Sequence, residues 1–572
     1  MNQICLSLSL FLVSCLPVYA AAPDIVFVNG KIVTVDDDFS IAEAFAIEDD
    51  RIVGVGSNAD ILKLKTETSK VVDLQGRTVL PGLIDSHVHP TGASMFEFDH
   101  PVPVMETMDD VLQYIRERTQ VVEKGKWISL SQVFITRLRE QRYPTRAELD
   151  EAAPDHPVYF RTGPDAALNS LALAANKIDK EFKVPEGNGA IVERDESGEP
   201  TGVIRKAGSL VKRGETGEKK PTDIDRKNRL KELLADYNKV GLTSISDRNT
   251  SASGMGLYQE LKGAGELTCR VYAYRAFSAS GTSESIADRM KRLADDPLHA
   301  YNNMLWSRGI KLFLDGGMLT GSAYMREPWG VSEIYSITDP NYRGTKYIEA
   351  DRLYEIAKLA LENDLQITAH SVGDGAVHAL VDAYERVNSD DFPVRDGRPC
   401  ITHCNFMSAD AIDRMAKIGI VADLQPAWLL LDGATLQKQF GDKRTEYFQP
   451  YQTLFQKNVV VGGGSDHMQK IGGLRSVNPY NPFLGMWITL TRQPRWTDQP
   501  LHPEQRINRE QAIRLYTINN AYLTFEEKEK GSLESGKLAD FIILKQDILE
   551  CRVEEIKEIE VKETWLGGKR VY

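Results

Sequence analysis

The stretch that decides the fold is Val79-Leu80-Pro81-Gly82-Leu83-Ile84-Asp85-Ser86-His87-Val88-His89. Its apolar pair Leu83-Ile84 predicts a short buried strand, and residues two apart on a strand point to the same side. The imidazoles of His87 and His89 should therefore converge at the carboxyl end of this strand, in an arrangement that suits a divalent metal. A single His-x-His pair is weak evidence, so the interpretation depends on whether further ligands follow.

Further candidate ligands stand at the ends of later apolar runs. The segments Gln366-Ile367-Thr368-Ala369-His370 and Cys400-Ile401-Thr402-His403 each end in a histidine, and the run that begins at Val459 ends at Asp466. Segment 309–315 is also apolar but carries Lys311 in its interior. A polar residue at one strand end is commonly structural. Four such runs, separated by helical sequence, indicate a shared metal site.

Eight segments of this kind are expected to form one parallel barrel. Helical periodicity lies between several of them, as at Leu353, Ile356, Ala357 and Leu361. This alternation predicts an α/β protein with a (β/α)₈ TIM-like barrel, whose sites gather at the carboxyl ends of strands. Every candidate ligand stands at such an end except Lys311, whose long side chain could reach along the interior. The expected strands are 83–87, 242–247, 271–275, 310–315, 366–370, 400–404, 421–425 and 459–466.

Both ends of the chain are rich in short strands. The Asn29-Gly30 pair between two β-rich runs predicts a hairpin, and Gly567-Gly568 predicts another near the C-terminus. We therefore expect a small β-sandwich domain built from residues 23–80 and 525–572, beside a barrel at 81–524. The interval between the first barrel strand and Leu242 is too long for one crossover. A subdomain at about 95–239 should be inserted there, and an insertion after a barrel strand emerges on the catalytic face.

These motifs resemble the metal-dependent amidohydrolase superfamily, and within it the YtcJ-like branch that includes N-substituted formamide deformylases. The resemblance covers nearly the whole chain after residue 22 and implies the same barrel and terminal β domain. Related sequences often carry a Gly-His pair before an Asn-Ser-x-Ala-Leu run, whereas this chain has Gly163-Pro164 before the run at 169–173. That departure weakens any inference of a substrate from the relatives. The motifs that carry the resemblance are 81–89, 310–316, 370–374, His403, 465–466 and 531–540.

The resemblance implies a site for two Zn²⁺ or other first-row divalent ions. Neutral imidazoles and carboxylates are suitable ligands for such ions. One ion would be held by His87, His89 and Asp466, and the second by His370 and His403.

Lys311 would bridge the two ions as a carbamate formed with CO₂. Physical chemistry agrees with this role, because burial in an apolar barrel disfavours the charged ammonium and a neutral amine can add CO₂. The alternative is that Lys311 is a buried cation paired with Asp315 or Asp247.

The implied reaction is hydrolysis of an amide-type carbon–nitrogen bond, other than a peptide bond, in a small molecule. A metal-activated hydroxide would attack the carbonyl, with Asp466 as general acid and base. One alternative is a mononuclear deaminase or cyclic amidine hydrolase on the same scaffold, which Lys311 disfavours. Another is a non-catalytic binding or regulatory relic, which the complete ligand set disfavours. Candidate substrate contacts, for which a salt bridge or loop anchor is the favoured interpretation, are Asp247, Arg248, Tyr324 and Arg326.

The first 22 residues carry no charge and are mostly apolar from Ile4 to Leu16. Small residues at 20–22 fit signal cleavage, so residues 1–22 are predicted to be a signal peptide. Leu12-Val13-Ser14-Cys15 also resembles a bacterial lipobox, which would leave a lipid anchor at Cys15; cleavage near 20–22 is favoured. The apolar stretch is shorter than the ~20 residues of a membrane span. Either route predicts a secreted or periplasmic protein.

The composition of the rest of the chain excludes some partners. The net charge of −13 argues against nucleic acid. After residue 22 only four cysteines remain, too few for a disulfide scaffold. Cys400 and Cys404 stand at odd offsets from His403 and are expected to be core thiols. The expected partner is a small amide-type substrate. The sequence leaves undecided whether the protein forms a homodimer.

Overall fold

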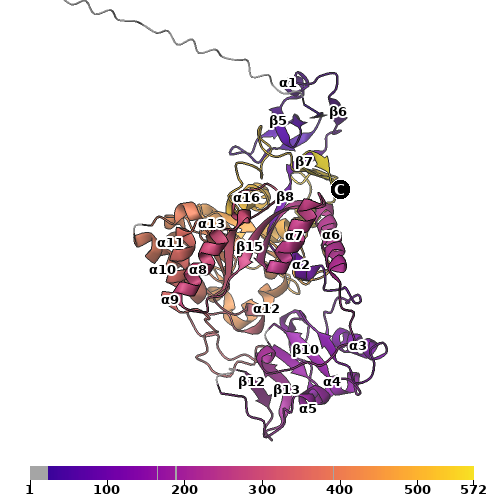
Figure 1. Cartoon of the computed structure of the whole chain (residues 1–572), viewed down its shortest axis with the longest axis vertical. Coiled ribbons are helices and arrows are strands. Elements are labelled where there is room, and N and C mark those ends of the chain that lie inside the picture. The colour runs from indigo at the N-terminus through magenta and orange to yellow at the C-terminus, as the bar shows by residue number, and fades with distance from the viewer. Residues whose placement is uncertain (1–22, 164, 187–189, 391) are drawn as a thin grey trace, which may run out of the picture.

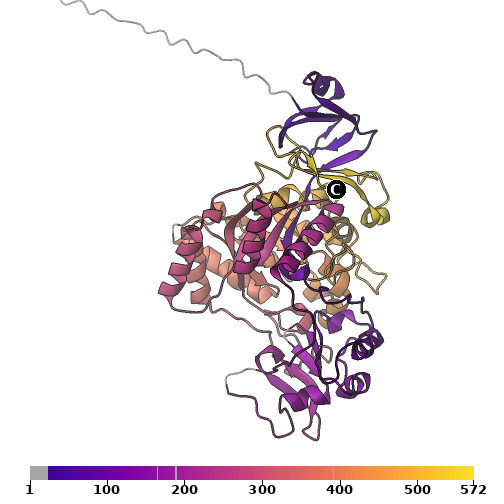
Figure 2. The same ribbon diagram turned by 45° about the vertical axis from the view of Figure 1, so that its right-hand side comes forward.

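The computed structural model describes residues 23–163, 165–186, 190–390 and 392–572. A strand-rich domain lies at one end of the long axis, the barrel lies in the middle, and the inserted lobe lies at the other end (Figures 1 and 2). The chain passes from the strand-rich domain into the barrel through β7 (Thr78–Pro81), which is followed directly by β8 (Leu83–Val88). The predicted signal segment, with Cys15, lies outside the described residues.

An eight-stranded, all-parallel sheet forms the barrel, and its strand order follows the sequence. The two edges meet where Val88 forms a parallel bridge with His467, just beyond the last strand. The predicted TIM-like barrel is therefore confirmed. Its strands are β8, β14 (Leu242–Thr250), β15 (Arg270–Ala276), β16 (Leu305–Phe313), β17 (Gln366–Ser371), β18 (Cys400–His403), β19 (Val421–Leu424) and β20 (Val461–Gly463).

Amphipathic helices cover the outside of the barrel. Helix α9 buries Leu353, Ile356, Ala357 and Leu361, the face that the periodicity predicts, and places them in the largest hydrophobic core. The helices around the barrel are α6 (Asp223–Lys239), α7 (Ala252–Gly263), α8 (Ser283–Ala294), α9 (Ala350–Glu362), α10 (Asp374–Ser389), α11 (Ala409–Ile418), α12 (Ala427–Thr445), α13 (Tyr451–Gln456), α14 (Pro482–Thr491), α15 (Arg509–Leu515) and α16 (Ile518–Leu523).

Two sheets make up the strand-rich domain, and one of them joins strands from both ends of the chain. This six-stranded sheet pairs β7 with β21 (Phe541–Leu544) and β2 (Lys31–Val33), and continues through β3 (Ile41–Ala42), β22 (Val561–Leu566) and β23 (Lys569–Arg570). The four-stranded sheet contains β1 (Ile25–Val28), β4 (Ala44–Glu48), β5 (Arg51–Gly56) and β6 (Lys70–Asp73), with α1 (Asn58–Leu62) beside it. The predicted domain built from both termini is present.

The hairpin predicted at Asn29-Gly30 is wrong, whereas the one at Gly567-Gly568 is confirmed by the antiparallel pair β22–β23. Strand β1 pairs with β4 and β6, and β2 pairs with β3 and β7, so the turn links two sheets. A Cβ on Gly30 would lie 2.5 Å from Leu74 and 2.7 Å from Ile32. The turn is therefore packed between the sheets, and local turn chemistry alone did not decide which strands pair.

The insertion between β8 and β14 forms a lobe of its own at the far end of the molecule (Figure 1). Helix α2 (Pro90–Ala93) follows the first barrel strand, and α6 returns the chain to the barrel, where Leu230 and Leu233 join the barrel core. No described helix is long and apolar enough to cross a membrane. The described part of the lobe contains a five-stranded sheet, three α-helices and two short 3₁₀ helices: β9 (Ile128–Leu130), β10 (Val158–Thr162), β11 (Asp165–Leu168), β12 (Ile191–Arg194), β13 (Pro200–Arg205), α3 (Met108–Thr119), α4 (Arg146–Ala152), α5 (Ser170–Ala175) and the 3₁₀ helices Ile135–Arg137 and Ala207–Ser209.

Candidate metal centre

Three of the predicted ligands form a compact cluster at the carboxyl ends of the first and last barrel strands. The Nε2 atoms of His87 and His89 lie 3.3 Å apart, and Asp466 Oδ1 lies 3.4 Å from the first and 3.1 Å from the second. All three ligand atoms lie within 4.8 Å of one another. The side chain of His87 is 1% exposed and that of His89 is 28% exposed, so solvent reaches the cluster from the side of His89.

Closure of the barrel holds this cluster together. The N–H of Asp466 donates to the carbonyl of His87 at 2.8 Å, and the N–H of His89 donates to the carbonyl of His467 at 2.8 Å. A Cβ on Gly464 would lie 2.8 Å from the backbone nitrogen of His87 and 2.7 Å from Ser86 Oγ. Glycine is therefore required at position 464 for the last strand to approach the first.

The second predicted pair, His370 and His403, lies beside the first cluster. The His403 ring centroid is 4.5 Å from that of His370 and 4.9 Å from that of His87. His370 Nε2 is 3.3 Å from the carbonyl oxygen of Gly316, and Trp428 stacks on His403 at 4.8 Å. Both His403 (φ 74°) and Asp466 (φ 55°) have left-handed backbones. Such strain in non-glycine residues is concentrated at functional sites.

Two residues that the sequence reasoning missed orient the imidazoles from below. Asp423 Oδ2 accepts from His87 Nδ1 at 3.0 Å, and Gln425 Oε1 accepts from His403 Nδ1 at 2.7 Å. A carboxylate can only accept, so the proton of His87 is on Nδ1 and its Nε2 lone pair faces the cluster. Asp423 and Gln425 are two apart at the end of an otherwise apolar strand. Two polar residues spaced two apart at a strand end point to the same side, and this pattern could have identified them as site residues.

Lys311 lies in the barrel interior without a polar partner. Its side chain is buried, and none of the described residues accepts a hydrogen bond from Nζ or forms an ion pair with it. Asp315 instead accepts three backbone N–H groups, and Asp247 accepts from the Tyr258 hydroxyl at 2.9 Å. Neither carboxylate is the ion-pair partner of the alternative interpretation. Burial, followed by the charge of Arg248, lowers the pKa of Lys311 to about 7.

The surroundings keep the buried imidazoles neutral. Burial lowers the pKa of His370 to about 3, and the Lys311 charge acts in the same direction. Burial likewise lowers the pKa of His87 and of His403 well below the usual range. Neutral imidazoles, a carboxylate and fixed Nδ1 partners are the donor chemistry that a first-row divalent ion requires. The residues present therefore fit the implied metal.

Among the described residues, none of the four candidate substrate contacts hydrogen-bonds to a candidate metal ligand. Arg248 is fully buried beneath it, where its guanidinium donates to Ser86 O and Thr368 Oγ1 and lies 4.1 Å from the Tyr274 ring centroid. Asp247 is also buried, and its partner Tyr258 belongs to α7.

Tyr324 and Arg326 belong to the loop after β16 and cover the start of α10. The Tyr324 N–H donates to Asp315, and the Arg326 N–H donates to Asp374 at 2.9 Å. Both residues therefore anchor a loop, which is the role that the sequence analysis favours over substrate contact.

Other polar residues near the cluster have structural roles. His467 Nδ1 lies 2.7 Å from the Tyr237 hydroxyl, and its Nε2 lies 2.8 Å from two backbone carbonyls. Cys400 and Cys404 are buried free thiols, and burial raises the pKa of both. They are core residues, as expected, and not part of a metal cluster with His403.

Comparisons with known proteins identify the family of the chain. The model of the amidohydrolase family matches residues 70–572. The chain is 27% identical to the N-substituted formamide deformylase of Arthrobacter pascens over 558 residues, which cover 95% of this chain and 97% of that protein. It is 25% identical to the putative amidohydrolase YtcJ of Bacillus subtilis (strain 168), with 95% of this chain and 98% of that protein covered.

Solved structures show the same fold. An uncharacterized metal-dependent hydrolase from Pyrococcus furiosus superimposes with a TM-score of 0.65 at 22% identity, covering 92% of this chain and 100% of that one. The resemblance stated from the motifs is thus confirmed. The chain belongs to the amidohydrolase family of metal-dependent hydrolases, and it is an enzyme for the hydrolysis of carbon–nitrogen bonds.

Proposed function

We propose that the protein is an exported amidohydrolase that cleaves an amide-type carbon–nitrogen bond in a small molecule. The observation that carries the proposal is the cluster of His87, His89 and Asp466, whose ligand atoms lie within 4.8 Å of one another at the carboxyl face of the barrel. The match along nearly the whole chain to a protein named N-substituted formamide deformylase supports the choice of amides.

Two divalent ions, Zn²⁺ or another first-row metal, would be held by the residues of this face. His87, His89 and Asp466 would hold one, His370 and His403 the other, and Lys311 would bridge them as a carbamate. When bound, the ions supply Lewis acidity, which lowers the pKa of water and polarises the substrate carbonyl. Lys311 suits the bridge because its amine is buried, has a pKa lowered to about 7 by that burial, and donates to no described acceptor.

Asp466 is the proposed proton carrier. Its carboxylate would take the proton from the water whose oxygen bonds to the carbonyl carbon, and would return it to the nitrogen as the carbon–nitrogen bond breaks. Asn478 supports Asp466, because its Nδ2 donates to the Asp466 carbonyl at 2.7 Å. Asp423 and Gln425 hold the two imidazoles in the tautomers that leave Nε2 free. Each of these steps depends on groups that the fold fixes before the substrate arrives.

A mononuclear deaminase or cyclic amidine hydrolase is the second candidate. One observation favours it: among the described residues, only His87, His89 and Asp466 form a group of three or more His, Cys, Asp or Glu side chains whose ligand atoms lie within 4.8 Å of one another. Lys311 and the adjacent pair His370 and His403 favour two ions. The count of bound metal therefore decides between the two candidates.

The test is a screen of the metal-loaded full chain against N-formyl, N-acyl and cyclic amides, together with elemental analysis. We expect turnover of at least one amide class and close to two metal equivalents. The substitution His370→Ala should remove roughly one equivalent and most of the activity. One equivalent at saturation would favour the deaminase candidate, and full loading with no turnover of any class would overturn the enzyme assignment.

Export is proposed on the uncharged apolar segment 1–22. Cleavage near Ala22 would leave every described strand intact, because β1 begins at Ile25. Mass spectrometry of the protein from its native host should find an N-terminus near Ala21 or Pro23, or a lipidated Cys15. An intact Met1 would contradict the proposal. Sedimentation of the same material would test the homodimer.

A further inference from the structure

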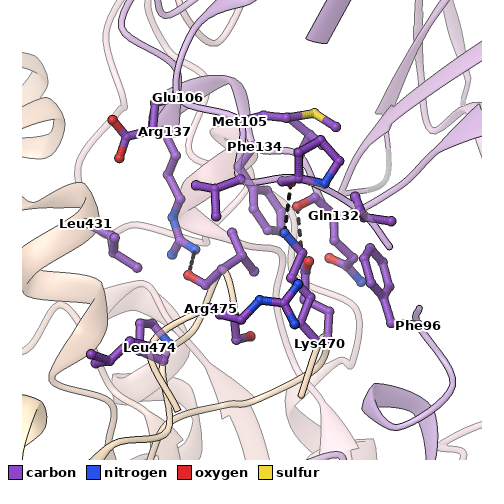
Figure 3. A pocket seen from close by; sticks show the side chains of 18 of the residues that line it. Phe96, Met105, Glu106, Gln132, Phe134, Arg137, Leu431, Lys470, Leu474 and Arg475 are labelled. Atoms are coloured by element: carbon purple, nitrogen blue, oxygen red, sulfur yellow. Dashed lines mark hydrogen bonds between the residues drawn. The ribbon is translucent and has the colours of Figure 1, made fainter. Parts of the chain in front are cut away.

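A cavity of about 180 Å³ lies between the inserted lobe and the loop that follows Asp466. Its walls come from segments 96–106 and 131–137 of the insertion, from 469–479 after the last barrel strand, and from α12 (Figure 3). None of the candidate metal ligands lines it. It is smaller than the ~300–1,000 Å³ that whole drug-sized ligands occupy, so it would hold one end of a substrate.

The walls combine apolar side chains with cations. In Figure 3, Arg137, Lys470 and Arg475 lie among the apolar side chains of Phe96, Met105, Phe134, Leu431 and Leu474. Two lining residues, Val104 at 61% and Leu474 at 58%, are among the most exposed large hydrophobic residues described. A ligand with an apolar body would cover this surface.

The charges in the cavity are unbalanced. Arg137 pairs with Asp432 and Arg475 pairs with Glu97, both at hydrogen-bond distance. Lys470 donates only to the carbonyl of Pro103 at 2.9 Å.

Arg495 likewise donates only to backbone carbonyls, those of Leu431 and Arg137. No carboxylate of the described residues pairs with Lys470 or Arg495, and the one acidic lining residue, Glu106, lies 4.0 Å from Arg139. Glu97 acts on Lys470, and Asp432 and Glu106 act on Arg495, only at longer range. Two cations without an ion-pair partner at this wall favour an anionic ligand.

Hydrogen bonds link the wall of the cavity to the backbone of Asp466. Arg137 Nη1 donates to Asn478 Oδ1 at 2.9 Å, and Asn478 Nδ2 donates to the Asp466 carbonyl at 2.7 Å. Gln469 and Lys470, in the same loop as Asp466, line the cavity. The wall of the cavity is therefore joined to the backbone of the proposed proton carrier by hydrogen bonds and by the loop that both share.

We infer that this cavity binds the carboxylate end of the substrate, with Lys470 and Arg495 contacting the anion and the apolar walls contacting an adjoining side chain. The substrates would then be amides that carry a free carboxylate, of which an N-acyl amino acid with an apolar side chain is the simplest. This inference rests on the proposed function and names its substrate class.

The first experiment compares matched substrates on the metal-loaded full chain. N-formylphenylalanine and N-acetylphenylalanine carry the carboxylate, and their primary carboxamides differ from them only in lacking the charge. We expect kcat/KM to be at least about 10-fold higher for the carboxylates, the range of one or two charge-assisted hydrogen bonds. Phenylacetate, but not phenylacetamide, should inhibit competitively.

The second experiment changes the two cations. Lys470→Met and Arg495→Met should each lower kcat/KM for the carboxylates about 10-fold, chiefly through KM, and leave the carboxamides nearly unchanged. Lys470→Arg should restore part of the loss. Lys124→Met is the matched control, because it removes one positive charge from an exposed site of the same lobe, where Lys124 pairs with Asp155. Thermal unfolding of each variant identifies any that fail to fold. If both cation variants fail to fold, competitive inhibition of the unaltered protein by phenylacetate decides whether the anion binds in the substrate site.

The outcomes separate this inference from the proposed function. Turnover of neutral amides with no preference for carboxylates would overturn the inference and leave the function standing. Non-competitive inhibition by phenylacetate would also overturn it, because the anion would then bind apart from the substrate. Competitive inhibition that Lys470→Met and Arg495→Met abolish would support it. If no amide is turned over, the proposed function fails, and the inference fails with it.

Discussion

The two halves of the metal centre differ in how far the fold alone has assembled them. In the first half, His87, His89 and Asp466 place their ligand atoms within 4.8 Å, and hydrogen bonds between the first and last strands hold them there. In the second half, His370 and His403 meet through their rings, and Lys311 has no hydrogen-bond or ion-pair partner among the described residues, its Nζ lying 5.6 Å from the centroid of the Phe313 ring. Backbone closure therefore organises the first half, whereas in the proposed mechanism a carbamate on Lys311 would complete the second.

The largest expected effect comes from Asp466, which belongs to the first half and is the proposed proton carrier. Asp466→Asn should lower kcat by about 10²–10⁴-fold, the usual contribution of a general acid–base group. Steady-state kinetics on the best substrate of the screen would measure it. Asp247→Asn is the control, because Asp247 is a buried carboxylate at a neighbouring strand end that bonds to Tyr258. Equal losses in both variants would remove the special role of Asp466.

Lys311 in the second half should show the next largest effect. Lys311→Ala should lower metal content and turnover together, and acetate or propionate should restore part of both by supplying a carboxylate in the space left. Lys311→Arg should not restore metal content or turnover, because a guanidinium stays protonated and forms no carbamate. Elemental analysis and kinetics with and without added carboxylate would measure this. Full metal content and activity in Lys311→Ala would refute the bridge.

The barrel, its strand order and the ligands at its strand ends follow from the sequence, because apolar runs that end in His or Asp encode both the strand and its functional end. Other features did not follow. Asp423 and Gln425, which orient two of the imidazoles, were not among the candidate residues. The pairing around Asn29-Gly30 is decided by packing between two sheets, which a local turn signal does not contain. Arg248 lies inside β14, which continues to Thr250, and its side chain is buried beneath the candidate ligands. The sequence does not show which side of this strand faces the barrel interior.

The residues that orient the imidazoles should have smaller effects, and different ones in the two halves. Asp423→Asn should weaken metal binding through His87, and Gln425→Leu through His403, each by about 10–100-fold. Isothermal titration of the metal-free protein would measure both. Asp423 also lies 3.5 Å from Arg248 Nε, so thermal unfolding must accompany that variant. Identical losses at both metal sites from either variant would show that the two halves are coupled.

The smallest expected effect tests whether the inserted lobe supports the first half at all. Arg137 lies in the short 3₁₀ helix Ile135–Arg137 of the lobe, pairs with Asp432 of α12 at 2.7 Å and donates to Asn478, which in turn holds the Asp466 backbone. Because breaking a buried pair by removing one partner leaves an uncompensated charge, Arg137 should be changed together with Asp432.

Arg137→Met with Asp432→Leu should lower kcat by about 10-fold without changing metal content, since a misplaced carboxylate transfers protons poorly but still binds the ion. Asn478→Ala alone should do the same. If Arg137 acts through Asn478, combining all three changes should cost no more than either set alone, and this non-additivity is what a double-mutant cycle measures. Additive losses would mean that the lobe stabilises the barrel generally. In that case the positions of His87, His89 and Asp466 would depend on strand closure alone.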